Sequence, residues 1–176
     1  MNGPLPASNP SFLVGVDDVI KELFEGLWPL PFGVSYNSYI IKDEKIALID
    51  TVEAGFEEEF IAEIESTIGD RPVDYLIVNH MEPDHSSLTA YMLDRYPEMK
   101  IVANSKTLPM LMGYYGVGED RVTVVGEAQT LSLGSCTLRF HMIPMVHWPE
   151  TMVTYLEEEK TLFSGDAFGT FGAVDE

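Results

Sequence analysis

Apolar segments alternate with helix-like segments between residues 36 and 125, and only strand-like segments follow from there to residue 163. Short apolar runs bounded by turn residues indicate strands, whereas apolar residues spaced by three and four indicate one face of a helix. This order predicts a mixed sheet with helices on its outer face, as in an α/β or α+β domain. The predicted strands span residues 36–41, 45–50, 73–78, 100–103, 121–125, 129–133, 136–143, 152–157 and 161–163.

Three helices are predicted between these strands. The first has apolar residues at helical spacing over residues 56–68, and five glutamates on its other face indicate a solvated surface. The second lies around residues 88–93 and ends near Pro97, and the third spans residues 105–115. A turn at residues 42–44 joins the first two strands into a hairpin, so the order begins with an antiparallel pair.

The charge balance restricts the possible partners. Ten basic and 29 acidic residues give the 176-residue chain a net charge of −19, which repels nucleic-acid phosphates and anionic membranes. Hydrophobic residues make up 45%, enough for a packed core, but the apolar runs are too short to predict a membrane span. The single cysteine and the lack of a signal-peptide pattern favour a reducing, cytoplasmic location. We expect one domain over residues 12–176, preceded by a flexible arm over residues 1–11.

Residues that can bind metal gather directly after the strand predicted at 73–78. His80, Glu82, Asp84 and His85 fall within six positions, just before the second predicted helix. In an extended segment His80, Glu82 and Asp84 would face one side, and a bend would be needed to aim His85 the same way. Burying four such groups at a strand end is costly without a cation, so we favour a metal site over an ordinary polar loop.

Two further candidates follow later strands in the same way. His147 lies beyond the strand predicted at 136–143, and Asp166 lies just past the strand predicted at 161–163. The six candidates supply three imidazoles and three carboxylates, which could hold two metals with one carboxylate bridging them. Such mixed nitrogen and oxygen ligation suits iron or manganese and tolerates zinc. Cys136 and His141 lie outside any cluster, and we expect both to be structural.

The spacing His-x-Glu-x-Asp-His, followed by His147 and by Gly165-Asp166, resembles the metallo-β-lactamase fold in its flavodiiron form. Hydrolases of that superfamily commonly carry His-x-His-x-Asp-His, and here Glu82 stands in the second histidine position, which is the flavodiiron departure. The similarity extends from about Val14 to the end of the chain. Its other motifs are Phe24-Glu25-Gly26-Leu27-Trp28-Pro29-Leu30-Pro31, Gly33-Val34-Ser35-Tyr36-Asn37-Ser38-Tyr39, Leu48-Ile49-Asp50-Thr51 and His147-Trp148-Pro149.

The resemblance implies an αββα sandwich with a non-haem di-iron centre that reduces O2 to water or NO to N2O. In this family the electrons come from FMN, which reaches the site across a head-to-tail homodimer. A rubredoxin, a flavoprotein or another electron donor would supply them. The positions that match the family's ligands are His80, Glu82 and His147 for one iron, Asp84 and His85 for the other, and Asp166 as the bridge.

Flavodiiron proteins are much longer than this chain, so the resemblance implies only the N-terminal half to two-thirds of the di-iron domain. The flavodoxin-like domain that binds FMN, and a further histidine ligand of the second iron, would belong to a missing C-terminal segment. Two alternatives stay open: a dizinc hydrolase, in which a metal-bound water is the nucleophile, and a non-catalytic truncated remnant. Glu82 argues against the hydrolase, because an added carboxylate weakens the Lewis acidity of the metal.

Overall fold

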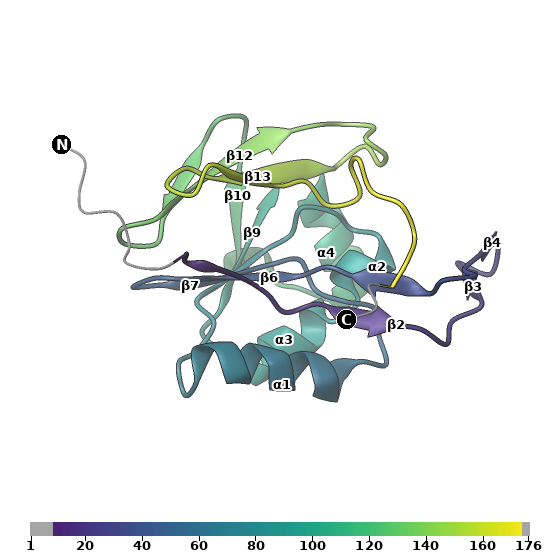
Figure 1. Cartoon of the computed structure of the whole chain (residues 1–176). Coiled ribbons are helices and arrows are strands. Elements are labelled where there is room, and N and C mark those ends of the chain that lie inside the picture. Colours follow the sequence, from purple (N-terminus) through teal and green to yellow (C-terminus); the bar gives the residue numbers. More distant parts are fainter. Residues whose placement is uncertain (1–8, 174–176) are drawn as a thin grey trace.

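A computed structural model describes residues 9–173, whose two main sheets are stacked with helices on one outer face, beside two small two-stranded sheets (Figure 1). The strands are β1 (Ser11–Leu13), β2 (Val16–Asp18), β3 (Leu23–Phe24), β4 (Trp28–Pro29), β5 (Val34–Tyr36), β6 (Tyr39–Lys42), β7 (Ile46–Ile49), β8 (Tyr75–Ile77), β9 (Lys100–Asn104), β10 (Val122–Val125), β11 (Thr130–Ser132), β12 (Thr137–Met142), β13 (Met152–Leu156) and β14 (Thr161–Phe163). The helices are α1 (Glu57–Ile68), α2 (Pro83–Ser86), α3 (Thr89–Arg95) and α4 (Thr107–Tyr115), with a 3-10 turn at Glu119–Arg121.

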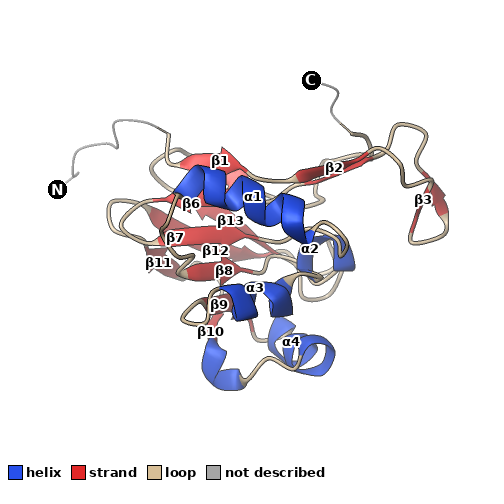
Figure 2. Ribbon diagram, turned by 90° about the horizontal axis from the view of Figure 1, so that it is seen from below, coloured by secondary structure: helices blue, strands red, loops and turns tan. Residues whose placement is uncertain are grey.

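The larger sheet has the strand order β1-β6-β7-β8-β9-β10, and the smaller sheet has the order β11-β12-β13-β14. Strands β7 to β10 are parallel to one another, whereas the smaller sheet is antiparallel throughout. Parallel neighbours need a crossover connection, and α1, α3 and α4 form these crossovers on one face of the larger sheet (Figure 2). The carboxyl ends of the parallel strands therefore meet at a single edge of the sheet.

Both faces of the larger sheet are apolar, because successive side chains of each strand point into two different hydrophobic cores. Ile40 and Leu76 belong to the core against the helices, whereas their neighbours Ile41 and Ile77 belong to the core between the sheets. All four side chains are fully buried, which explains why these strands appear in the sequence as continuous apolar runs. The smaller sheet contributes to the second core Leu138, Phe140, Met152, Leu156 and Phe163.

Helix α1 shows how the sequence determines one of these elements. Phe60, Ile64 and Ile68 lie on its buried face, four residues apart in each step. Three glutamates occupy the first turn, where negative charge is favourable because of the helix dipole. The helix ends at Gly69, whose φ of 66° is a conformation that favours glycine.

The predicted mixed sheet with helices on its outer face is confirmed, and the layers follow the order helix, sheet, sheet of the expected αββα sandwich. Within residues 9–173, no helix covers the outer face of the smaller sheet (Figure 1). From β6 onward each predicted strand or helix is present, most with boundaries shifted by a few residues, and the strand predicted at 161–163 has the bounds of β14. The segment predicted around residues 88–93 differs, because a separate helical turn, α2, precedes α3.

The N-terminal region differs from the prediction. No strand was predicted before residue 36, yet β1 to β4 lie there, and the strand predicted at 36–41 is divided into β5 and β6. Strands of two or three residues are too short to show a period, which is why the sequence pattern missed them. Of the arm predicted at residues 1–11, residues 1–8 lie outside the described residues, and Ser11 already pairs with Ile41 in β6.

Candidate metal centre

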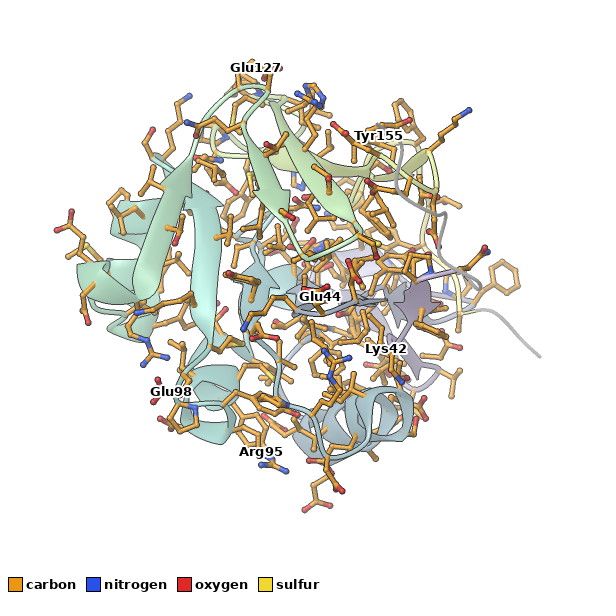
Figure 3. All side chains as sticks on the ribbon, turned by 90° about the vertical axis from the view of Figure 1, so that its left-hand side faces the viewer. Lys42, Glu44, Arg95, Glu98, Glu127 and Tyr155 are labelled. Atoms are coloured by element: carbon orange, nitrogen blue, oxygen red, sulfur yellow. The ribbon has the colours of Figure 1, made fainter. Side chains whose placement is uncertain are left out.

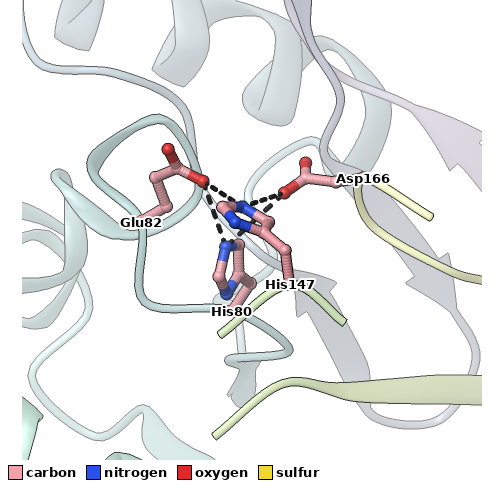
Figure 4. Close-up of side chains that lie close together, drawn as sticks. All are labelled: His80, Glu82, His147 and Asp166. Carbon is pink, nitrogen blue, oxygen red and sulfur yellow. Dashed lines mark hydrogen bonds and ion pairs between the residues drawn. The ribbon is translucent and has the colours of Figure 1, made fainter. Parts of the chain in front are cut away.

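The candidate ligands lie at one end of the two sheets, on segments that follow strands. His80 and Glu82 come directly after β8, His147 lies in the loop between β12 and β13, and Asp166 follows β14 (Figure 4). The remaining two candidates belong to α2. Because the two sheets are stacked, side chains from sequence-distant loops reach one point.

One group consists of His80, Glu82, His147 and Asp166. Each offers a ligand atom, and these atoms all lie within 4.8 Å of one another. Oε2 of Glu82 is 3.2 Å from Nε2 of His80 and 2.7 Å from Nε2 of His147 (Figure 4). Oδ2 of Asp166 is 3.3 Å from Nε2 of His147 and 3.5 Å from Nε2 of His80. Two imidazole nitrogens and two carboxylate oxygens therefore surround one position.

A second group consists of Asp84, His85 and Asp166, again with ligand atoms within 4.8 Å of one another. Nε2 of His85 is 2.6 Å from Oδ1 of Asp166 and 3.6 Å from Oδ2 of Asp84. Asp166 is thus shared, and its two oxygens face different groups. Oδ1 faces His85, whereas Oδ2 faces the histidines of the first group.

Asp84 and His85 lie in a helical turn and not in the extended segment that the spacing predicted. The backbone of Glu82 is extended, with φ −58° and ψ 144°, and Pro83 occupies the first helical position. The change from extended to helical backbone at Pro83 is the bend that brings His85 to the cluster. The hydroxyl of Ser86 lies 2.9 and 3.0 Å from the carbonyl oxygens of Met81 and Glu82 and holds this turn in place.

Burial and neighbouring charges shift the pKa values of the cluster in opposite directions. Burial raises the pKa of Asp84 to about 6, and Oδ1 of this side chain has no hydrogen-bond partner among the described residues. Burial lowers the pKa of His85, but the hydrogen bonds to Asp166 and Asp50 and the negative charges of Asp50 and Asp84 together outweigh it, so the net pKa is well above the ordinary value. The hydrogen bond to Glu82 likewise helps to raise the pKa of His80 against the effect of burial. Protons on the imidazoles and a bound metal ion are alternative ways to offset the same carboxylate charge.

A cavity of about 600 Å³ lies over the cluster, and the residues that line it indicate whether a metal ion suits this site. Glu82, Asp84 and Asp166 all line it, and the described lining residues include no lysine or arginine that could pair with these carboxylates. Glu82 and Asp84 are largely buried, whereas Asp166 is exposed, and burying a carboxylate without a cationic partner is costly. The donor set of imidazoles and carboxylates, together with the unpartnered Oδ1 of Asp84, therefore fits divalent metal ions.

Two buried carboxylates contact the Nδ1 atoms of candidate histidines, and the sequence analysis assigned neither carboxylate a role. Oε1 of Glu150 is 2.9 Å from Nδ1 of His80, and Oδ2 of Asp50 is 3.3 Å from Nδ1 of His85. Asp50 also accepts a hydrogen bond of 2.7 Å from the backbone amide of Asn79. The available signal was that Asp50 lies within the motif Leu48-Ile49-Asp50-Thr51 and that Glu150 directly follows the motif His147-Trp148-Pro149.

The two residues expected to be structural lie away from the cluster. Cys136 is buried in the core between the sheets, and burial raises the pKa of its thiol to about 12. His141 lies in β12, where its Nδ1 is 2.8 Å from Oε1 of Glu127. Neither residue joins the two groups of candidate ligands.

A family model described as "ODP family beta lactamase" matches residues 34–176, most of the chain. The chain belongs to this family. The predicted resemblance to flavodiiron proteins is also confirmed, because a solved structure of the flavodiiron protein from Giardia intestinalis matches 97% of the chain. That match has a TM-score of 0.89 and 32% sequence identity, and it covers 42% of the Giardia chain.

Two relatives with names that state an activity are similar over nearly the whole chain. The rubredoxin-oxygen oxidoreductase of Megalodesulfovibrio gigas is 35% identical over 93% of this chain, which corresponds to 41% of the relative. The nitric oxide reductase of Moorella thermoacetica is 34% identical over 96% of this chain and 43% of the relative. This chain therefore spans less than half the length of these relatives. Among residues 9–173, no helix combines the length and the apolar character needed to cross a membrane.

Proposed function

We propose that this chain is the metal-binding part of a non-haem di-iron oxidoreductase that reduces O2 to water or NO to N2O with electrons from FMN. The observation that carries the proposal is the position of Asp166, whose two oxygens face two separate groups of ligand-type residues. A shared carboxylate of this kind suits a bridge between two metal ions. The names of the two relatives, a rubredoxin-oxygen oxidoreductase and a nitric oxide reductase, support O2 and NO as the substrates.

Iron suits this donor set better than a metal that prefers sulfur, because the cluster offers imidazoles and carboxylates and its described residues include no thiolate. When bound, two ferrous ions supply electrons jointly to a diatomic molecule. We assign two irons to the complete site. The proposed ligands are His80, Glu82 and His147 for one iron, Asp84 and His85 for the other, and Asp166 as the bridge.

The residues of this chain prepare the site for a small substrate. The cavity over the cluster leaves room for a diatomic molecule, and Phe24, Trp28 and Phe171 give part of its wall an apolar surface. The carboxylates of Glu82 and Asp166 face the imidazoles directly. Their negative charge offsets the positive charge that develops when a metal pair gives up electrons.

The partners of the reaction are part of the same proposal. A flavodoxin-like domain would bring FMN to the site across a head-to-tail homodimer, and a further segment would add a histidine to the second iron. A rubredoxin, a flavoprotein or another electron donor would reduce the FMN, and the name of the relative from Megalodesulfovibrio gigas supports rubredoxin. We propose a cytoplasmic location, because the only cysteine of the chain is buried and unpaired.

A dizinc hydrolase is the second candidate, and the description of the family model as a beta lactamase favours it. Elemental analysis of the chain, purified after expression with both iron and zinc available, separates the two functions. We expect iron in preference to zinc, whereas stoichiometric zinc with negligible iron would favour the hydrolase.

Reaction with substrate tests the oxidoreductase directly. The iron-loaded chain is reduced chemically without oxygen and then mixed with a limited amount of O2 or NO. We expect iron oxidation together with consumption of the gas, and the same chain without iron is the control. Iron that stays reduced with both gases would contradict the proposal.

A further inference from the structure

The imidazole of His80 is contacted at both of its nitrogens. Nε2 faces the candidate metal position, at 3.2 Å from Oε2 of Glu82, and Nδ1 lies on the opposite side of the ring. There it is 2.9 Å from Oε1 of Glu150, whose side chain is completely buried. Glu150 is not among the proposed metal ligands, so its contact with His80 needs a separate explanation.

We propose that Glu150 is a positioning residue that holds His80 as the tautomer with the proton on Nδ1, which leaves the lone pair of Nε2 for the metal. This inference rests on the metal site of the proposed function. Histidine ligands commonly donate their other ring N–H to a carboxylate, which fixes both the tautomer and the direction of the ring.

Only one position of the proton satisfies the hydrogen-bonding groups around Nδ1 of His80. The carboxylate of Glu150 has acceptors and no donor when it is ionised. Its Oε1 already accepts a hydrogen bond of 3.0 Å from the backbone amide of Met81. The hydroxyl of Thr151, 3.4 Å from Nδ1, donates its proton to the carbonyl oxygen of Trp148 at 3.0 Å. Both neighbours of Nδ1 are thus acceptors, so the proton belongs on Nδ1.

Glu150 is anchored from two directions, so it can fix the ring. The side-chain amide of Asn104, at the end of β9, donates a hydrogen bond to the backbone carbonyl of Glu150. Oδ1 of Asn104 in turn accepts hydrogen bonds from the backbone amides of Lys106 and Thr107, which fixes the side chain of Asn104. The bond from Met81 ties the carboxylate to the segment that carries His80. The ring of Trp148 packs edge-on against the His80 ring, with 5.2 Å between the ring centroids.

The second oxygen of Glu150 shows that this residue does not serve packing alone. Oε2 is buried and has no hydrogen-bond partner among the described residues. A buried acceptor without a partner destabilises the fold. An apolar side chain would avoid that cost, so the carboxylate is favoured by its contacts with His80 and with the backbone amide of Met81.

The chain supplies a matched control far from the cluster. Glu127 contacts Nδ1 of His141 at 2.8 Å and the backbone amide of Met142 at 2.8 Å, which repeats the two contacts of Glu150. Glu127 lies at the periphery of the molecule (Figure 3). Glu150→Gln and Glu127→Gln therefore remove the same charge from the same kind of contact, but only the first change touches a candidate ligand.

The tautomer is read by nitrogen-15 NMR of labelled histidine, in the zinc-loaded chain and in the metal-free chain at an alkaline pH where imidazole is neutral. We expect His80 to carry its proton on Nδ1, with a downfield proton resonance that moves upfield in Glu150→Gln. A proton on Nε2 of neutral His80 would overturn the inference. This measurement needs only the unaltered chain, so it decides the question even if a variant does not fold.

The affinity for Zn2+ is measured by titration against a competing chelator. We expect Glu150→Gln to weaken the tighter binding step about 10- to 100-fold, the usual effect of losing such a partner, and Glu127→Gln to leave it unchanged. Glu150→Asp keeps the charge and should recover part of the affinity. Equal affinities of Glu150→Gln and Glu127→Gln would overturn the inference. An unaltered chain that binds no metal, yet has the Nδ1 proton, would instead refute the proposed metal site.

Discussion

Replacing Asp166 with asparagine is expected to weaken metal binding at both positions, because each oxygen of this carboxylate faces a different group. Oδ1 lies 2.6 Å from Nε2 of His85, and Oδ2 lies 3.3 Å from Nε2 of His147. The amide has the same size but only one acceptor oxygen and no charge. Loss of a partner behind a ligand costs about 10- to 100-fold in affinity, so loss of the ligand itself should cost at least about 100-fold at each position. That factor corresponds to about 2.8 kcal/mol.

Anaerobic titration of the metal-free chain with Fe2+, in competition with a coloured chelator, measures both binding steps. Glu82→Gln and Asp84→Asn are the matched controls, because each of these carboxylates belongs to one group only. Each should weaken one step and leave the other close to the value of the unaltered chain. Glu127→Gln should change neither step, and thermal unfolding of every metal-free variant identifies any loss of folding.

Two results would refute the assignment of Asp166. If Asp166→Asn keeps both steps at the unaltered affinity, the carboxylate binds no metal. If it weakens one step only, Asp166 is a ligand of a single ion and the centre has no carboxylate bridge at this residue.

Three further predictions concern the metals and the core. Elemental analysis after iron-replete expression should find more iron than zinc, and the reverse ratio would contradict the choice of metal. The same Fe2+ titration should show two unequal steps, because the described residues offer four ligands to one position and three to the position of Asp84 and His85; two equal steps would contradict this. Phe60→Ala should lower the free energy of unfolding by about 3–5 kcal/mol, because the side chain is fully buried in the core beneath α1. The exposed Glu59→Ala should change the free energy of unfolding by less than about 0.5 kcal/mol, and similar denaturation midpoints for the two variants would contradict the packing of α1.

Much of the fold could be predicted from local patterns. Strands β6 to β9 are buried on both faces, so each forms a continuous apolar run, and α1 repeats its buried residues at helical spacing. The strands before Tyr36 could not be predicted, because two or three residues show no period. Their positions depend on pairing with distant partners, as when Val16 in β2 lies opposite Tyr36 in β5.

The candidate ligands could be named from the sequence, but their grouping could not be derived from spacing alone. Asp84 and Glu82 are two residues apart, yet their carboxylates fall into different groups because a helical turn begins between them at Pro83. The resemblance to a known family implied the same division, and the structure gives it a physical cause. The contact of Glu150 with His80 was not predicted at all.

The sequence by itself determined the order of strands and helices and the candidate ligands at the strand ends, because strand ends and helix periods can be identified from residues that are close together in the chain. Spacing alone did not decide which carboxylate lies between the two groups, which the family resemblance had implied to be Asp166, and only the tertiary structure showed that Glu150 contacts His80. Asp166 is 81 residues from His85, and Glu150 is 70 residues from His80. These residues meet because the smaller sheet stacks on the larger one, which brings the loops after β12 and β14 over the ends of the parallel strands.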